Sequence, residues 1–297
     1  MSELIKNQNF GVEIEMNGIS RPHAQKVVAR ILGSNRMGVR GGYDNHYVID
    51  NTGREWKCES DSSINHVGEG TCELVTPILQ YQDIELLQKI VRELRAEGAR
   101  TDSSCGIHVH VDGSNHNCRS LKNLVNFFYN RQDLIYEALE IGARKDRWCR
   151  PICQDLKKEI KSSNSIETFE RIWYSSANDG YSGGIDHQHY NRTRYHALNL
   201  HAFFSKGTVE FRLFNSTLHA GKIKAYIQFC LAVSAWAIET ERTVSFKDTS
   251  HYSPAEKFTI WKNLIRNRLG LTGEEFMTCR QHMLRAMKNN AHLEVAA

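Results

Sequence analysis

The stretch Phe10-Gly-Val-Glu-Ile-Glu-Met16 alternates apolar and acidic residues, and this alternation points to a sheet protein. Successive side chains of an extended chain face opposite sides, so the apolar residues share one face while Glu13 and Glu15 share the other. The segment therefore predicts a strand with one buried face and one face that carries two carboxylates.

Two later stretches repeat the pattern, Gly106-Ile-His-Val-His-Val-Asp112 and Thr208-Val-Glu-Phe-Arg-Leu-Phe214. The residues on their polar faces are His108, His110, Asp112, Glu210 and Arg212. A half-solvated antiparallel sheet also alternates in this way, and that interpretation stays open for any single strand. Carboxylates and imidazoles are metal ligands, however, and two carboxylates two residues apart repel each other unless a cation lies between them. Three such strands favour one shared site.

The rest of the chain alternates between short strand patterns and helical periodicity. Further strands are expected at 46–50, 55–59, 72–77 and 197–204. Helices are expected after an N-cap at Asp83, after Ser120, over 222–239 and twice in the last forty residues. Strands without regular helical crossovers indicate an α+β fold with a mixed or antiparallel sheet.

Composition is that of an ordinary globular protein. The 297 residues include 38 Lys and Arg against 34 Asp and Glu, a net charge of +4 that gives no reason to expect a nucleic-acid partner. The longest apolar stretch, 229–238, is about half of the roughly 20 residues that span a membrane, and no signal peptide is visible, so we expect a cytoplasmic protein without membrane association. No linker divides the chain, which predicts a single domain over 1–297, with the motifs in about 10–241 and a helical extension over about 242–297.

Two more acidic residues and one loop extend the candidate site. Asp61 and Glu73 alone could be solvated surface acids, but together with the strand carboxylates they offer the oxygen ligands that Mg²⁺ or Mn²⁺ prefers. Asp186-His-Gln-His189 lies in a long polar stretch, where it is either a surface loop or a contact for substrate or metal. Neither a Gly-x-Gly-x-x-Gly nor a His-Glu-x-x-His motif occurs.

Taken in order, these motifs resemble the amidoligase family, which is distantly similar to glutamine synthetase and glutamate–cysteine ligase. The resemblance is carried by FGVEIEM, the DSSI at 61–64, CELVTP, SCGIHVHVD and RYHALNLHAFFSKGTVEFRLFNSTL. It implies a curved, largely antiparallel sheet backed by helices, whose concave face holds ATP and divalent metals.

Residue by residue, the resemblance implies two metal sites and a set of phosphate contacts. Glu15, Asp61 and Glu73 would hold one metal, and Glu13, His108 and Glu210 would hold a second beside the nucleotide phosphates. Arg212 would face the transferring phosphate, and His110 would lie near the phosphates. Lys206, expected in the turn before the last strand, could add a phosphate contact or be a solvated turn lysine.

The implied activity is ATP-dependent joining of a carboxylate to an amine through an acyl phosphate, with Mg²⁺ or Mn²⁺. Its partners would be small-molecule or peptide carboxylates and amines. Two alternatives use the same cluster of residues: a two-metal hydrolase that needs no ATP, and a nucleotide- or metal-binding protein without turnover.

Overall fold

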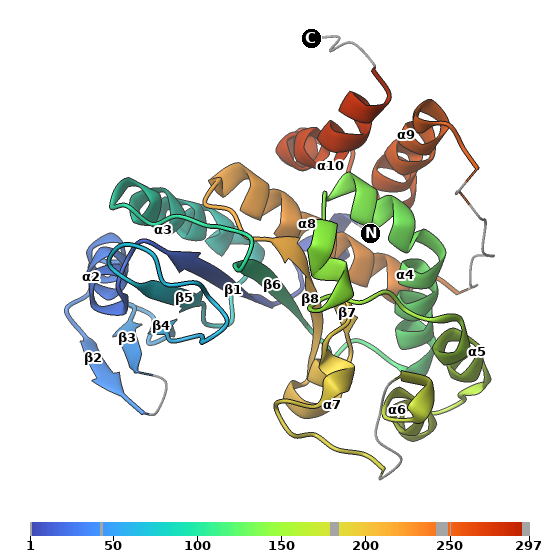
Figure 1. Ribbon diagram of the computed structural model, residues 1–297, viewed down its shortest axis with the longest axis horizontal. Helices are drawn as coiled ribbons and strands as arrows, with labels where there is room; N and C mark the ends of the chain where they lie inside the picture. Colours follow the sequence, from blue (N-terminus) through green and yellow to red (C-terminus); the bar gives the residue numbers. More distant parts are fainter. Residues whose placement is uncertain (1, 42–43, 179–183, 242–248, 250, 293–297) are drawn as a thin grey trace. The chain divides into compact units, whose positions relative to one another are not determined.

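The computed structural model describes residues 2–41, 44–178, 184–241, 249 and 251–292 (Figure 1). Within these residues, eight strands form one sheet in the order β2-β3-β4-β5-β1-β6-β8-β7. The strands are β1 (Phe10–Asn17), β2 (Met37–Arg40), β3 (Asn45–Ile49), β4 (Glu55–Glu59), β5 (Thr71–Val75), β6 (Gly106–Asp112), β7 (Leu198–Asn199) and β8 (Thr208–Asn215). The pairs β1–β5, β2–β3, β3–β4, β4–β5 and β7–β8 are antiparallel, which confirms the α+β class.

The helices lie mostly between the strands and after them. They are α1 (Ser2–Lys6), α2 (Arg21–Leu32), α3 (Ile84–Ala96), α4 (Cys118–Ala138), α5 (Gln154–Ser162), α6 (Ile166–Trp173), α7 (His201–Lys206), α8 (Ala220–Glu239), α9 (Pro254–Asn263) and α10 (Met277–Asn290). The last two are the helices expected near the end of the chain. Over the described part of the chain, no helix combines the length and the apolar character that crossing a membrane requires.

The chain divides into two compact units, which we describe separately. The sheet unit comprises 7–110 and 214–227, and the helical unit comprises 1–6, 111–213 and 228–297. One boundary between the units follows α1, and the other three fall inside β6, β8 and α8. The expected single domain, with its motif region and extension, stays a prediction, as does the specific likeness to glutamine synthetase.

In the sheet unit, α2 packs against α3 and against β3, β4 and β5 (Figure 1). The helix begins where Ser20 accepts a hydrogen bond from the His23 amide at 3.4 Å, and it ends at Gly33, whose φ of 61° suits a residue without a Cβ. The apolar face of β1 is fully buried, as its alternation predicted. This packing fixes which face of the sheet is left for polar side chains.

The strand register places three carboxylates in one row of the sheet unit. Glu15 of β1 lies opposite Glu73 of β5, and Glu73 lies opposite Glu59 of β4. Directly opposed like charges destabilise a sheet. The row therefore needs a compensating group.

In the helical unit, α4 is buried along most of its length and packs against α5, α10 and β7. It begins earlier than predicted, at Cys118. Asn117 is the N-cap, and Ser120 lies one turn inside: the Asn117 side chain accepts from the Ser120 amide at 3.1 Å, and the Ser120 hydroxyl accepts from the Asn117 amide at 2.8 Å.

The predicted strand at 197–204 is wrong over most of its length. Only Leu198–Asn199 is extended, and α7 follows, so Lys206 ends a helix rather than lying in a turn. The helix is stopped by Gly207, whose φ of 73° gives the left-handed cap that glycine adopts without strain. Five further elements, α1, β2, α2, α5 and α6, were not predicted from the sequence. Residues 179–183, in the polar stretch that carries the second His-x-His, lie outside the described residues.

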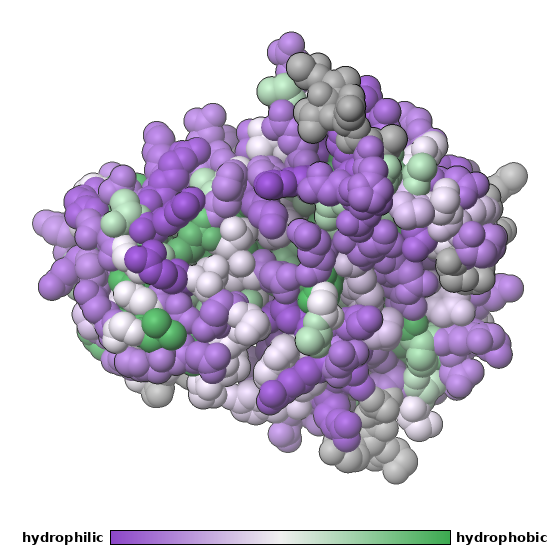
Figure 2. All heavy atoms as spheres, turned by 45° about the horizontal axis from the view of Figure 1, so that its top comes forward, coloured by the Kyte–Doolittle hydropathy of each residue, from purple (hydrophilic) through white to green (hydrophobic). Residues whose placement is uncertain are grey.

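The face shown in Figure 2 is mostly hydrophilic. Large apolar side chains that are exposed in the described residues come from several parts of the chain, and two of them, Met37 and Val39, share one face of the edge strand β2. The others are Val67, Ile78, Ile185, Tyr190 and Met277. Scattered exposed apolar residues are normal for a folded protein and need no partner to explain them.

Candidate functional site

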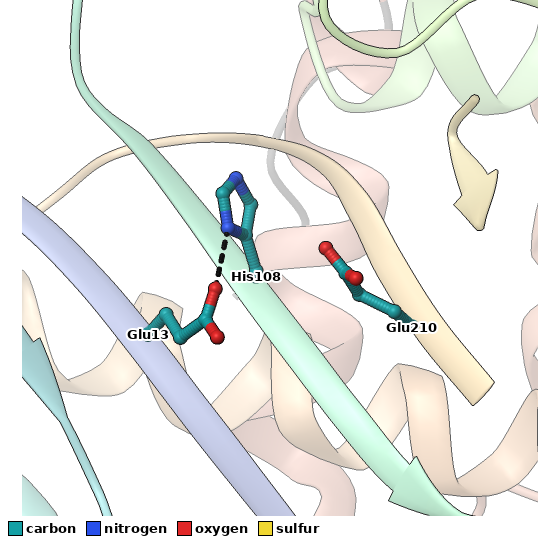
Figure 3. A group of neighbouring side chains, drawn as sticks. All are labelled: Glu13, His108 and Glu210. Carbon is teal, nitrogen blue, oxygen red and sulfur yellow. Dashed lines mark hydrogen bonds and ion pairs between the residues drawn. The ribbon is translucent and has the colours of Figure 1, made fainter. Parts of the chain in front are cut away.

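Glu13 of β1 lies between the two histidines of β6. Its carboxylate is 2.9 Å from Nδ1 of His108, the hydrogen bond drawn in Figure 3, and 3.2 Å from Nε2 of His110. Burial would raise the pKa of Glu13, but the charges and hydrogen bonds of His110 and His108 outweigh it and hold that pKa well below its ordinary value. The alternation in both strands thus brings together the residues that it placed on one face.

Glu15 is held more firmly than a surface carboxylate. Its side chain is 5% exposed, and one oxygen accepts a hydrogen bond from the Gly106 amide at 2.5 Å. The other oxygen lies 3.8 Å from Nε2 of His108, too far for a hydrogen bond. The backbone of β6 therefore orients Glu15 toward the imidazole without closing the gap between them.

Glu73 completes a group of three possible ligands in the sheet unit. One ligand atom from each of Glu15, Glu73 and His108 lies within 4.8 Å of the other two. Nε2 of His108 is buried and has no hydrogen-bond partner among the described residues. Burial raises the pKa of Glu73 well above its ordinary value, and the carboxylates of Glu13 and Glu15 raise it further.

These features fit a divalent cation. A buried imidazole nitrogen without a partner is costly, and so is a pair of carboxylates, one buried and one partly buried, that repel each other. A cation bound by Glu15, Glu73 and His108 would relieve both costs. Nδ1 of His108 already bonds to Glu13, the outer hydrogen bond that commonly orients a metal-binding histidine.

Two further acidic residues, Asp61 and Glu59, influence this group. Asp61 is close enough to raise the pKa of Glu73, but it is not in the described three-ligand group, and its carboxylate accepts a hydrogen bond from the Ser63 amide at 2.6 Å. Its assignment as a metal ligand stays a prediction. Glu59 raises the pKa of Glu73 as well, and sequence reasoning missed it, although it ends a predicted strand.

Glu210 and Arg212 form a buried pair in the helical unit. Figure 3 draws Glu210 on β8, where one carboxylate oxygen accepts from Arg212 at 2.7 Å and the other accepts from the Asn199 amide at 2.7 Å. Neither side chain is more than 6% exposed. The alternative that β8 presents a solvated polar face is therefore wrong.

A cavity of about 180 Å³ lies in the helical unit beside this pair. One face of α7 contributes His201 and Lys206 to it, and the cross-strand partners Asn199 and Glu210 contribute a second wall. Both histidines of the Asp186–His189 motif, His187 and His189, also line it. Lys206 and this motif were predicted separately. Their proximity was not predicted, because the sequence pattern indicated a strand over 197–204 where the structure has α7.

Comparison with known protein families identifies the family of this chain. Residues 6–234, more than half of the chain, match the family described as "putative amidoligase enzyme". The chain belongs to this amidoligase family. The match includes all the described strands and every residue that the resemblance assigned to a metal or to the phosphates. It ends inside α8. A search of curated proteins found no match.

Proposed function

We propose that this amidoligase is an ATP-dependent ligase that joins a carboxylate to an amine through an acyl phosphate. The observation that carries the proposal is the group of Glu15, Glu73 and His108, in which a buried imidazole nitrogen without a partner faces carboxylates that repel one another. Family membership supports ligase chemistry, and the group supplies what such chemistry needs from the protein, a fixed set of ligands for cations.

Two sets of residues would hold the metals. The group of Glu15, Glu73 and His108 would bind one Mg²⁺ or Mn²⁺. The resemblance instead assigns Asp61 to this ion and Glu13, His108 and Glu210 to a second, and these two assignments stay predictions. When bound, these ions would screen the repulsion between the ATP phosphates and the substrate carboxylate. The protein's own contribution is orientation, because the Gly106 amide fixes Glu15 and Glu13 fixes the ring of His108.

Arg212 would act on the phosphoryl group during its transfer. A guanidinium stays charged and binds two oxygens at once, which suits a phosphoryl group that moves between two anions. Its bond to Glu210 holds it in place before the reaction begins. His110, held by Glu13, would stand beside the same phosphates, and Lys206 would add a further positive charge.

A test of this proposal must separate it from a hydrolase and from a binding protein without turnover. ADP release is measured with Mg²⁺ or Mn²⁺ and pooled carboxylates and amines, with mass detection of any new amide. ADP that appears only when both substrates are present supports the ligase. Cleavage of esters or amides without ATP would favour the two-metal hydrolase.

Binding of cofactors is tested separately by thermal unfolding. A metal ion together with a non-hydrolysable ATP analogue should raise the unfolding temperature, because a ligand at 100 times its Kd stabilises the folded state by about 2.7 kcal/mol. A shift without amide product from any pool would favour the binding protein. No shift at saturating analogue and metal would argue against an ATP site.

A further inference from the structure

A half-buried arginine of the helical unit lacks an acidic partner. Arg131, in α4, lies over the ring of Phe127 one turn earlier, with its guanidinium carbon 5.0 Å from the ring centroid. Its Nη1 is buried and has no hydrogen-bond partner, and the side chain forms no ion pair with any described residue. A buried donor without an acceptor is costly, and more so when the group carries a charge.

A second arginine adds to this cost. Arg268 ends the π-helical turn Leu264–Arg268, which packs against α9 and α10, and α10 packs in turn against α4 (Figure 1). Burial, and after it the charge of Arg268, lower the pKa of Arg131 to about 10. Arg131 is therefore still charged at neutral pH, and the fold keeps two positive charges close together.

The carboxylates of α4 do not offset these charges. Asp133 follows Arg131 by two residues, and residues two apart on a helix do not face each other. Glu137 is engaged by Lys257 of α9 at 3.1 Å. Within the described part of the chain, burial and Arg268 act on the pKa of Arg131, and no carboxylate opposes them. An anion from outside the chain would supply both the missing acceptor and the missing charge.

We propose that Arg131 and Arg268 form a binding site for a phosphate group. Phosphate carries a charge of about −2 and several acceptor oxygens, so one group can bond to both guanidinium groups at once. Phe127 holds the guanidinium of Arg131 in a fixed orientation, which reduces the entropy lost on binding.

This site lies apart from the family's motifs along the chain. The family match ends at residue 234, so Arg268 is outside it, and neither arginine takes part in the proposed ligase reaction. The inference therefore stands or falls independently of that reaction. The same chemistry would take inorganic phosphate or the phosphate of a nucleotide, and the test separates the two.

The test is a calorimetric titration of the metal-free full chain with inorganic phosphate, with AMP and acetate titrated separately at the same ionic strength. The variants are Arg131→Gln and Arg268→Gln. Arg268 is exposed, so its replacement tests the site even if Arg131→Gln fails to fold. Arg266→Gln is the matched control, because Arg266 is an exposed arginine of the same turn. Arg212→Gln reports on phosphate held at the candidate catalytic residues.

We expect phosphate to bind the wild type and Arg266→Gln equally, and acetate, with its single charge, to bind more weakly. Arg131→Gln and Arg268→Gln should each weaken phosphate binding at least about tenfold, equal to about 1.4 kcal/mol, because each removes a charge-assisted hydrogen bond. AMP that binds as tightly as phosphate, with the same sensitivity to both variants, would identify the phosphate of a nucleotide as the ligand. Binding of phosphate without AMP would identify the free ion.

Three results would overturn the proposal. The first is no phosphate binding at the highest soluble concentration. The second is that Arg268→Gln binds phosphate like the wild type, or that Arg266→Gln weakens binding as much as Arg268→Gln, which would indicate general attraction to a basic surface. The third is that only Arg212→Gln loses phosphate, which would place the ion at the candidate catalytic residues.

Discussion

At the scale of single residues, Glu73 is a carboxylate whose charged form is disfavoured by the sheet unit. It is opposed by Glu15 on one neighbouring strand and Glu59 on the other, and burial together with these charges raises its pKa above the ordinary 4.5. Between pH 4.5 and that raised value, the folded protein holds a proton that the unfolded chain has lost. Stability of the metal-free protein therefore falls as pH rises through this window.

Replacing this carboxylate should separate stability from function. Glu73→Gln removes the repulsion, so we expect the metal-free variant to unfold at a higher temperature than the wild type at neutral pH. The same change removes a ligand charge, and Mn²⁺ binding should weaken at least about tenfold, or about 1.4 kcal/mol. Thermal unfolding and Mn²⁺ titration measure the two effects, with Glu85→Gln, an exposed carboxylate of α3, as the control. A variant that is less stable and still binds Mn²⁺ normally would contradict the proposed role.

Arg212→Lys tests the phosphoryl contact. Lysine keeps the charge beside Glu210 but loses the planar fork. We expect turnover to fall at least about tenfold, or about 1.4 kcal/mol of transition-state stabilisation, while metal affinity changes little. Glu210→Gln should instead weaken metal binding and turnover together, and Arg192→Lys should leave both unchanged. Wild-type turnover in Arg212→Lys would remove the phosphate role.

At the scale of elements, the sequence predicted strands well where one face was apolar and the other charged. β6 was predicted with its observed bounds, and β1 and β8 to within one residue. The strand predicted over 197–204 was wrong because the apolar residues of this segment are compatible with both a strand and a short helix. Gly207 favours the helix, since it provides the left-handed cap that ends it. The short helix and its cavity therefore could not be anticipated from local pattern.

The position of α7 also depends on a second glycine. A Cβ at Gly113 would lie 2.6 Å from the Gly207 carbonyl oxygen and 2.9 Å from the Phe203 ring. We expect Gly113→Ala to cost about 1–3 kcal/mol of unfolding free energy, the range of overpacking. Denaturant unfolding provides the measurement. Gly273→Ala, whose Cβ would meet its nearest neighbour at an ordinary contact distance of 3.9 Å, should cost less than Gly113→Ala.

At the scale of the whole molecule, the candidate site was predictable only in part. Alternation identified Glu13, Glu15 and His108, because strand periodicity fixes which residues share a face. Glu59 was missed, since its importance comes from the register between β4 and β5, a pairing that single-sequence periodicity does not reveal. Asp61, on a loop, has no periodicity to place it.

Buried histidines make the molecule sensitive to acid. Burial lowers the pKa of His116 and of His201 to about 4, while the unfolded chain takes up protons near 6.5. Stability should therefore fall as pH drops from 6.5 toward 4, by up to about 1.4 kcal/mol per pH unit for each histidine. His116→Gln should reduce this slope and His66→Gln, at an exposed position, should not.

Glu73 has the opposite pH dependence in the metal-free protein, so the acid measurement is best made in the Glu73→Gln background. Urea unfolding at a series of pH values gives the slope directly. An unchanged slope in His116→Gln would show that this histidine is not held neutral by the fold.

The hydrogen bond from the Gly106 amide to Glu15 gives the protein a natural spectroscopic reporter. The Gly106 amide nitrogen lies 2.5 Å from a carboxylate oxygen, and the proton of such a short hydrogen bond is strongly deshielded and slow to exchange with solvent. Any event that draws electron density from Glu15 would move this one resonance. The backbone amide signal of Gly106 alone would then follow occupancy of the carboxylate cluster in real time.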